Sequence, residues 1–213
     1  MKKYWKSYGV FLSGTLVKIL LFAAYPFAVI FMGLPAHIIG TMAMGSAMPG
    51  LLSAGSILVG AELIMDMFIF GGILNKETNK LEYLKTSHRG IPVLRKALQA
   101  DKVRRVLMIY LLLTVFYLLG AANVSYLSLI SFTFATAAVT ELILVISRHI
   151  TQMNWLILVI MLASLVEMGV GVLALILPPV CVILFVVLYV GIFLFSEKIV
   201  MKRMEESYYD SRA

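Results

Sequence analysis

The chain has few charged residues and little cysteine for its length. Only 14% of its 213 residues are charged, against about 25% in an ordinary soluble domain. A single soluble core of this size could not be covered by so few polar side chains. The one cysteine, Cys181, cannot form an internal disulfide, so the fold does not depend on an oxidising compartment. It lies in an apolar run, which favours a small buried residue over a reactive thiol.

Motifs for nucleotide, metal and hydrolytic chemistry are also missing. The sequence has no GxxxxGK[ST] phosphate-binding loop, no HExxH motif and no cysteine–histidine cluster. No G-x-S-x-G elbow occurs in a strand–turn–helix context. His37, His88 and His149 are scattered, with His37 expected on one side of a membrane and the other two on the opposite side. We therefore expect this chain to hold no catalytic residue, no metal and no cofactor.

What the sequence has instead is a series of long apolar segments. Hydrophobic residues make up 62% of the chain, and the mean hydropathy is +0.98. About 20 apolar residues cross a bilayer core as a helix. Pro178 and Pro179 are expected to break the last apolar stretch into two helices. The pattern predicts an all-α polytopic protein, with one transmembrane domain over 1–213 and six spans at about 9–34, 48–74, 106–122, 126–146, 155–177 and 178–195.

The positions of the basic residues predict the topology. The net charge is +7, and the lysines and arginines outside the spans fall before the first span, between spans two and three, between spans four and five, and after the sixth. By the positive-inside rule these regions are cytoplasmic, so both termini are expected inside. The basic excess is thus a topology signal and not a nucleic-acid site. The outer connections are short, so no extracellular domain is expected.

The connection at about 75–105 is the only sizeable polar segment. Leu81 and Leu84 suggest that the second span continues as a helix, which 87–90 interrupts. Pro92 suits the first turn of a new helix, and Leu94 begins an apolar face along it. We expect an amphipathic helix at the membrane surface, continuing to about Arg105. It could be an interfacial anchor or a docking element for a cytoplasmic protein, and composition does not separate the two.

The same segment carries a resemblance to a known family. The basic start MKKYWKSYGVF is followed, after the second span, by Glu77, the leucine-rich stretch 81–84, a break at 86–89 and a returning helix over 91–105. This order is similar to that of a membrane subunit of the ABC-2 class of ATP-driven transporters, in the short form without extracellular domains. His88 stands where that family often has proline.

The resemblance implies a function and partners. The chain would be the permease half of an exporter in the cell membrane, most simply the bacterial plasma membrane, and would pair with a second copy or a paralogue. ATP and Mg would bind a separate cytoplasmic ATPase. Its substrate would be an amphipathic peptide or a lipid-like molecule. The residues implied to contact the ATPase are Thr86, Ser87, His88, Arg89, Gly90, Ile91, Pro92 and Leu94.

Five ionisable residues fall within the predicted spans, where an ionised side chain costs about 2.5–3.5 kcal/mol on insertion scales. Three interpretations stay open. In the first, Lys18 pairs with an acid and the other acids bond to Ser, Thr or Tyr. In the second, the acids line a substrate path. The third is an ion-coupled secondary transporter using the carboxylates. The five residues are Lys18, Glu62, Asp66, Glu141 and Glu167.

Overall fold

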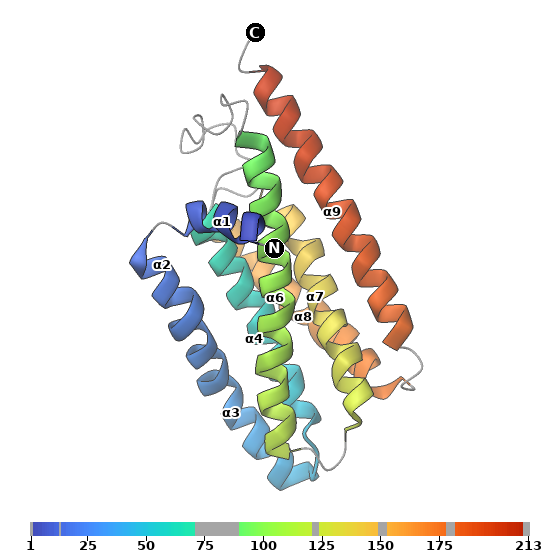
Figure 1. Cartoon of the computed structure of the whole chain (residues 1–213). Coiled ribbons are helices and arrows are strands. Elements are labelled where there is room, and N and C mark those ends of the chain that lie inside the picture. The colour runs from blue at the N-terminus through green and yellow to red at the C-terminus, as the bar shows by residue number, and fades with distance from the viewer. Residues whose placement is uncertain are drawn as a thin grey trace.

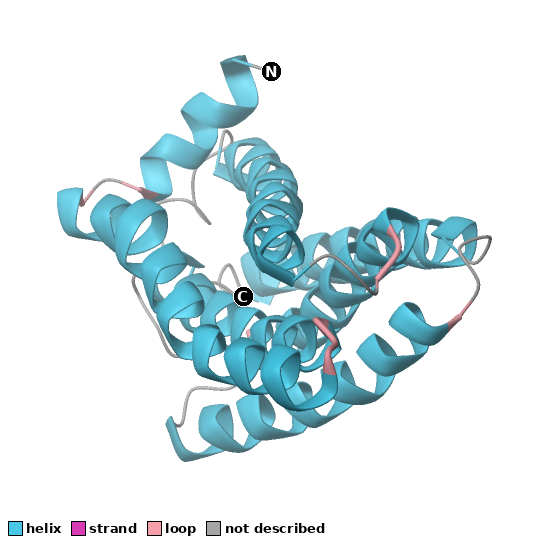
Figure 2. Cartoon of the chain, turned by 90° about the horizontal axis from the view of Figure 1, so that it is seen from below, coloured by secondary structure: helices cyan, strands magenta, loops and turns pink. Residues whose placement is uncertain are grey.

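The computed structural model describes residues 2–12, 14–70, 90–120, 124–148, 153–177 and 182–210, and every regular element in these ranges is helical (Figure 1). No strand occurs in these ranges, and Figure 2 colours them only as helices and loops. The elements are α1 (Lys2–Phe11), α2 (Thr15–Ile19), the π-helical turn η1 (Leu20–Ala24), α3 (Tyr25–Met44), α4 (Met48–Phe70), α6 (Gly90–Gly120), α7 (Tyr126–Ser147), α8 (Met153–Ile176) and α9 (Val182–Asp210).

Six helices are long and apolar enough to cross a membrane, as the hydropathy pattern predicts. The first of them is displaced from its predicted position. It runs over Thr15–Ala43, with α2, η1 and α3 in continuous succession, because the extended backbone of Gly14 (φ −86°, ψ 132°) separates it from α1. His37 therefore lies inside a helix and not in an outer connection. The predicted break near Pro178 is confirmed, since α8 ends at Ile176 and α9 begins at Val182.

Helix α6 contains the helix expected over 91–105 and joins it to the third span. Its 31 residues run without interruption from Gly90 through the third span to Gly120. At about 1.5 Å per residue the helix is roughly 46 Å long, longer than the roughly 30 Å of a hydrocarbon core. The hydropathy boundary near Val106 was wrong because Asp101, Arg104 and Arg105 look like loop residues in the sequence but are buried in the bundle.

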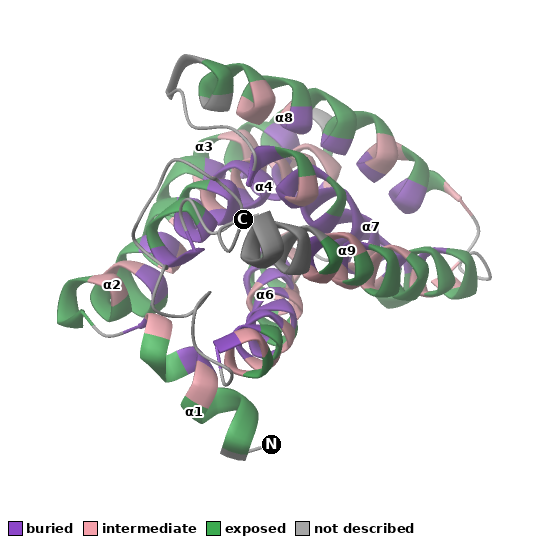
Figure 3. Ribbon diagram, turned by 90° about the horizontal axis from the view of Figure 1, so that it is seen from above, coloured by how far each residue is buried: buried purple, intermediate pink, exposed green. Residues whose placement is uncertain are grey.

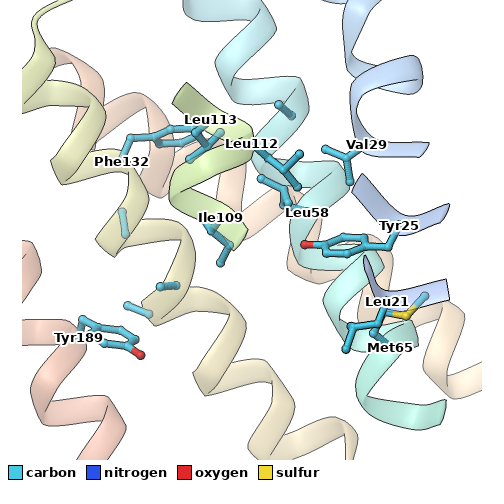
Figure 4. Packing of buried hydrophobic residues seen from close by; sticks show 14 of the residues in the cluster. Leu21, Tyr25, Val29, Leu58, Met65, Ile109, Leu112, Leu113, Phe132 and Tyr189 are labelled. Atoms are coloured by element: carbon cyan, nitrogen blue, oxygen red, sulfur yellow. The ribbon is translucent and has the colours of Figure 1, made fainter. Parts of the chain in front are cut away.

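Helices α4 and α7 form the centre of the bundle. α7 packs against α4, α6, α8 and α9, and α4 packs against α3, α6, α7 and α8. Viewed from above, these two helices are largely buried, whereas α3, α8 and α9 expose apolar faces outward (Figure 3). Such a surface suits lipid. The core of the bundle is built from large apolar side chains such as Leu58, Ile109, Leu113 and Phe132 (Figure 4).

One end of the bundle collects the polar parts of the chain. The end of α4, the start of α6, helix α1 and the C-terminal half of α9 all lie toward it (Figure 1). We call it the charged end, defined by Phe70 of α4 and Gly90 of α6. Helix α1 lies across the bundle there and packs against α6, with Tyr8 buried and Trp5 exposed.

At the opposite end His37 is wedged between three helices. It is only 4% exposed, and Phe116 of α6 meets it edge-on. Glycines on two other sides make room for the ring. A Cβ on Gly50 of α4 would lie 2.7 Å from the His37 Cβ, and one on Gly120 of α6 would lie 2.7 Å from its Cε1. The tight α3–α4 turn that sets this contact ends α3 on Gly45, whose φ of +60° favours glycine.

We therefore expect Gly50→Ala to destabilise the protein by about 1–3 kcal/mol, because the added methyl group would overlap the His37 side chain and backbone. Thermal unfolding in detergent measures the effect. Gly169→Ala on α8 is the matched control, since nothing lies within 4 Å of its new Cβ. Alanine is also the better helix former, by about 1 kcal/mol. Equal melting temperatures for the two variants would contradict the His37 wedge.

Candidate functional site

A buried ionic network occupies the charged end. Helix α6 supplies half of its charged residues within five consecutive positions, where Asp101, Arg104 and Arg105 are related by i,i+3 and i,i+4 spacing. The side chains of these residues are at most 3% exposed. Their partners on other helices include Glu62 and Asp66 of α4 and Glu141 of α7, and Arg148, the residue that follows α7, joins the network through Asp66. The network therefore joins elements that are far apart in the sequence.

Arg105 is the centre of this network. Its guanidinium contacts four carboxylates: Glu62 at 3.2 Å, Asp66 at 3.5 Å, and Asp101 and Glu141 in direct hydrogen bonds. Two of these acids lie on α4, one on α6 and one on α7. Because a guanidinium presents five donors in one plane, a single arginine can hold three helices in a fixed arrangement.

Two further arginines complete the contacts to α4. Arg104 binds Glu62 through both carboxylate oxygens, at 3.0 Å and 2.6 Å, and also bonds Asp101 at 3.0 Å. Arg148, just beyond α7, makes a two-point contact with Asp66 and lies over the Phe70 ring. Although burial disfavours its charge, Asp66 raises the pKa of Arg148 above the ordinary arginine value. Paired N–H donors to one carboxylate are the stronger kind of ion pair.

Lys102 extends the network to α9. Its ammonium lies 3.6 Å from Glu141, donates to Ser196 at 2.6 Å and to the carbonyl of Phe193 at 2.8 Å, and sits over the Phe193 ring. Ser196 in turn donates to Glu141 at 3.3 Å. Helix α9 is therefore held at the charged end by polar contacts as well as by its packing on α7.

The charges in this network balance. Four acids (Glu62, Asp66, Asp101, Glu141) face four cations (Lys102, Arg104, Arg105, Arg148), and all eight are buried. Each carboxylate accepts hydrogen bonds from cations, which leaves little capacity to act as a general base. Groups of three or more His, Cys, Asp or Glu able to hold a metal do not occur among the described residues. The arrangement is suited to fixing helices rather than to bond chemistry.

Helix α1 is attached to the same network through one hydrogen bond. The Tyr8 hydroxyl donates to Asp101 at 2.7 Å. Burial, together with the negative charge of Asp101, raises the pKa of Tyr8 well above its usual 10.0. Helix α1, which lies across the charged end, thus contacts the ionic network directly.

The structure brings together three of the four predicted path acids. Glu62, Asp66 and Glu141 belong to the network, whereas Glu167 on α8 lies apart and contacts Thr136 of α7 at 2.5 Å. That contact is of the kind expected in the structural interpretation, but the partners of the other three are mainly arginines. The ion pair that the first interpretation gives Lys18 does not occur among the described residues, where Lys18 is exposed.

The predicted ATPase-contacting residues divide into two groups. Thr86, Ser87, His88 and Arg89 lie outside the described residues, as do Glu77 and the stretch 81–84. Gly90, Ile91, Pro92 and Leu94 form the first turns of α6, where Pro92 is exposed and Leu94 is 1% exposed. Leu94 therefore faces the core and not a partner in this arrangement.

Sequence reasoning missed the cationic half of the network. Lys102, Arg104, Arg105 and Arg148 were interpreted as cytoplasmic loop charges, and Asp101 was not considered. A usable signal was the D-x-x-R-R spacing beside an apolar span, because it places an acid and two cations on adjoining helix positions. The predicted intramembrane acids Glu62, Asp66 and Glu141 needed cationic partners, which arginines at this spacing can supply.

We expect Arg105→Gln to lower the free energy of unfolding by about 3–5 kcal/mol, because it leaves buried carboxylates without a cation. Arg95→Gln is the control. Arg95 pairs with Glu197, but its side chain is 60% exposed, and exposed pairs contribute at most about 1 kcal/mol. Adding Glu141→Gln to Arg105→Gln should recover part of the loss. If Arg105→Gln and Arg95→Gln unfold alike in denaturant, the network does not stabilise the bundle.

Tyr8 generates a pH-dependent prediction. A raised pKa in the folded state means that the protonated hydroxyl stabilises the fold below the ordinary pKa of 10.0, and that this contribution is lost as the pH rises above it. Tyr8→Phe should therefore be less stable than wild type by a constant amount from pH 7 to 9. The difference in stability between wild type and Tyr8→Phe should shrink above pH 10. Thermal unfolding of both proteins at each pH measures it. A gap that widens with alkaline pH would contradict the Tyr8–Asp101 bond.

Comparison with known proteins finds no match: no family model, no curated protein and no solved structure is significantly similar to the chain. Function is therefore inferred from the sequence and the geometry alone.

Proposed function

We propose that this chain is the membrane subunit of an ATP-driven exporter of the ABC-2 class, working with a second copy or a paralogue and a separate cytoplasmic ATPase. The observation that supports this best is the ionic network. It ties α6 to α4, α7, α9 and α1 at the end of the bundle where α4 ends and α6 begins, the two helices that segment 71–89 connects in the chain. A force applied to that segment would reach five helices at once.

The geometry supports a simple route for such a force. Segment 71–89 joins α4 directly to α6. From Gly90 to Asp101 the rigid first part of α6 spans roughly 16 Å at about 1.5 Å per residue. A force from an ATPase on the start of α6 would move this part of the helix. Through their ion pairs, Arg104 and Arg105 would transmit the movement to α4 and α7. The carboxylates thereby act as mechanical attachments in the proposal, not as a substrate path.

The distribution of basic residues supports placing the charged end in the cytoplasm. Lys3 and Lys6 on α1, Lys96 on α6 and Lys198 on α9 all belong to elements at that end. Residues 45–47, 121–125 and 177–181, which connect the spans at the other end, contain no lysine or arginine. Both termini and segment 71–89 would then face the partner ATPase.

A lateral cavity supports a lipid-like or amphipathic substrate. About 490 Å³ lies between the first span, α4 and α8, with walls that include Leu20, Met32, Ile57, Gly60 and Ile160. Binding pockets for small molecules have about 300–1,000 Å³ and are mostly apolar. The described charged residues do not line this cavity, so an apolar chain would fit it and a strongly polar solute would not.

The competing function is an ion-coupled secondary transporter. One observation favours it: Glu167 is a buried carboxyl group without a cationic partner among the described residues. The other three predicted carboxylates are matched by cations, which counts against a relay through all four. The two functions differ in whether a partner ATPase exists.

Purification of the tagged protein from its native host in mild detergent tests the proposal. We expect an ATPase to co-purify and its activity to be detectable in the eluate. Arg89→Glu and Lys96→Glu should release most of it, because both reverse a charge beside or at the start of α6. Lys96 does not belong to the ionic network, so Lys96→Glu should leave the permease itself folded; Arg89 lies outside the described residues.

Lys198→Glu is the matched control. It makes the same charge change on an exposed position of α9 at the charged end, away from segment 71–89 in the chain. It should retain the ATPase. A folded wild-type protein that brings down no ATPase would overturn the exporter and favour the ion-coupled alternative.

A further inference from the structure

Glu167 is the one acid of the predicted spans that stands outside the ionic network. It is fully buried at 0% exposure between α8, α4 and α7. Space for it comes from Gly55 of α4, where a Cβ would lie 3.0 Å from Glu167 Oε1, and the ring of Phe132 packs beside it. Its second oxygen, Oε2, has no hydrogen-bond partner among the described residues.

No cation compensates this carboxyl group within the described bundle. On α4 the charged residues are Glu62 and Asp66, and both are bound to arginines. On α7 the only charged residue is Glu141, which is bound to Arg105. On α8 Glu167 itself is the only one. An ionised carboxylate in such a place is too costly to persist, and the group is neutral instead.

The geometry at Thr136 fits the same state. The Thr136 Oγ1 atom lies 2.9 Å from the carbonyl oxygen of Phe132 and 2.5 Å from Glu167 Oε1. Both separations are those of hydrogen bonds, yet a hydroxyl has a single hydrogen to donate. The carbonyl of Phe132 has none. If Thr136 donates to Phe132, the hydrogen between Thr136 and Glu167 belongs to Glu167.

We propose that Glu167 is a proton-binding site in the centre of the bundle, with the proton on Oε1 and donated to Thr136 Oγ1. Thr136 then donates to the carbonyl of Phe132, so a short chain of hydrogen bonds links α8 to α7. The neutral carboxyl group leaves only its carbonyl oxygen Oε2 unpaired, which costs less than an unpaired negative charge.

The proton thereby becomes part of the packing of α8. Helix α8 packs against α4 and α7, and loss of the proton would place an uncompensated charge between all three helices. Departure of the proton and separation of α8 are therefore linked events. The inference does not depend on the exporter proposal and holds for any function of the chain.

Infrared difference spectroscopy at pH 7 tests the site. The spectrum of wild type minus Glu167→Gln should show the carbonyl stretch of a protonated carboxyl group, shifted on exchange into D₂O. Glutamine can still donate an N–H to Thr136, so this variant is expected to fold. Glu141→Gln is the internal control and should instead show the two stretches of an ionised carboxylate, since Glu141 is paired with Arg105.

Thr136→Val provides a second reading that does not require a change at Glu167. It keeps the shape of the side chain and removes the acceptor, so the Glu167 carbonyl band should move to higher frequency without disappearing. Carboxylate bands assigned to Glu167 in the first difference spectrum, or a Glu167 band that Thr136→Val does not move, would overturn the proposal.

Discussion

Burial of charge in an apolar bundle is the constraint on which the rest of this structure depends. A single buried ion is costly, and removing one member of a buried pair costs about 3–5 kcal/mol. The chain meets this constraint by bringing four acids and four cations to one end, with Arg105 in contact with all four carboxylates. The positions of α1, α4, α6, α7 and α9 at that end follow from these contacts.

The contrast between the two ends of the bundle follows from the same constraint. At the charged end the helices are held by directional ion pairs, which allow one arrangement and penalise small displacements. At the other end α3, α4 and α6 meet through His37 and glycines, where contact depends on shape alone. The bundle is thus polar and strongly specified on one side, and apolar and closely packed on the other.

The sequence was sufficient for the helical class, six apolar spans and the break near Pro178, because each follows from the local density of apolar residues. It also predicted the bounds of α4 and α7 to within a few residues where the structure describes them. It failed at α6, since hydropathy counts Asp101, Arg104 and Arg105 as polar whether or not they neutralise partners on other helices. Pairing across 42 residues, as between Glu62 and Arg104, leaves no periodic signal in a single sequence. For the same reason Lys18 was expected to pair, and Glu167 could not be separated from the other acids.

The separation of the paired charges along the chain has a consequence for biogenesis. Glu62 is synthesised 42 residues before Arg104, and Asp66 is synthesised 82 residues before Arg148. When the last residue of α4 is added to the growing chain, none of the cations that bind its acids has been made. The second span alone carries two carboxylates that oppose partitioning into lipid, and α6 alone carries cations that do the same. The acids of the second span can therefore be fully neutralised only after the segment around Arg148 has been translated.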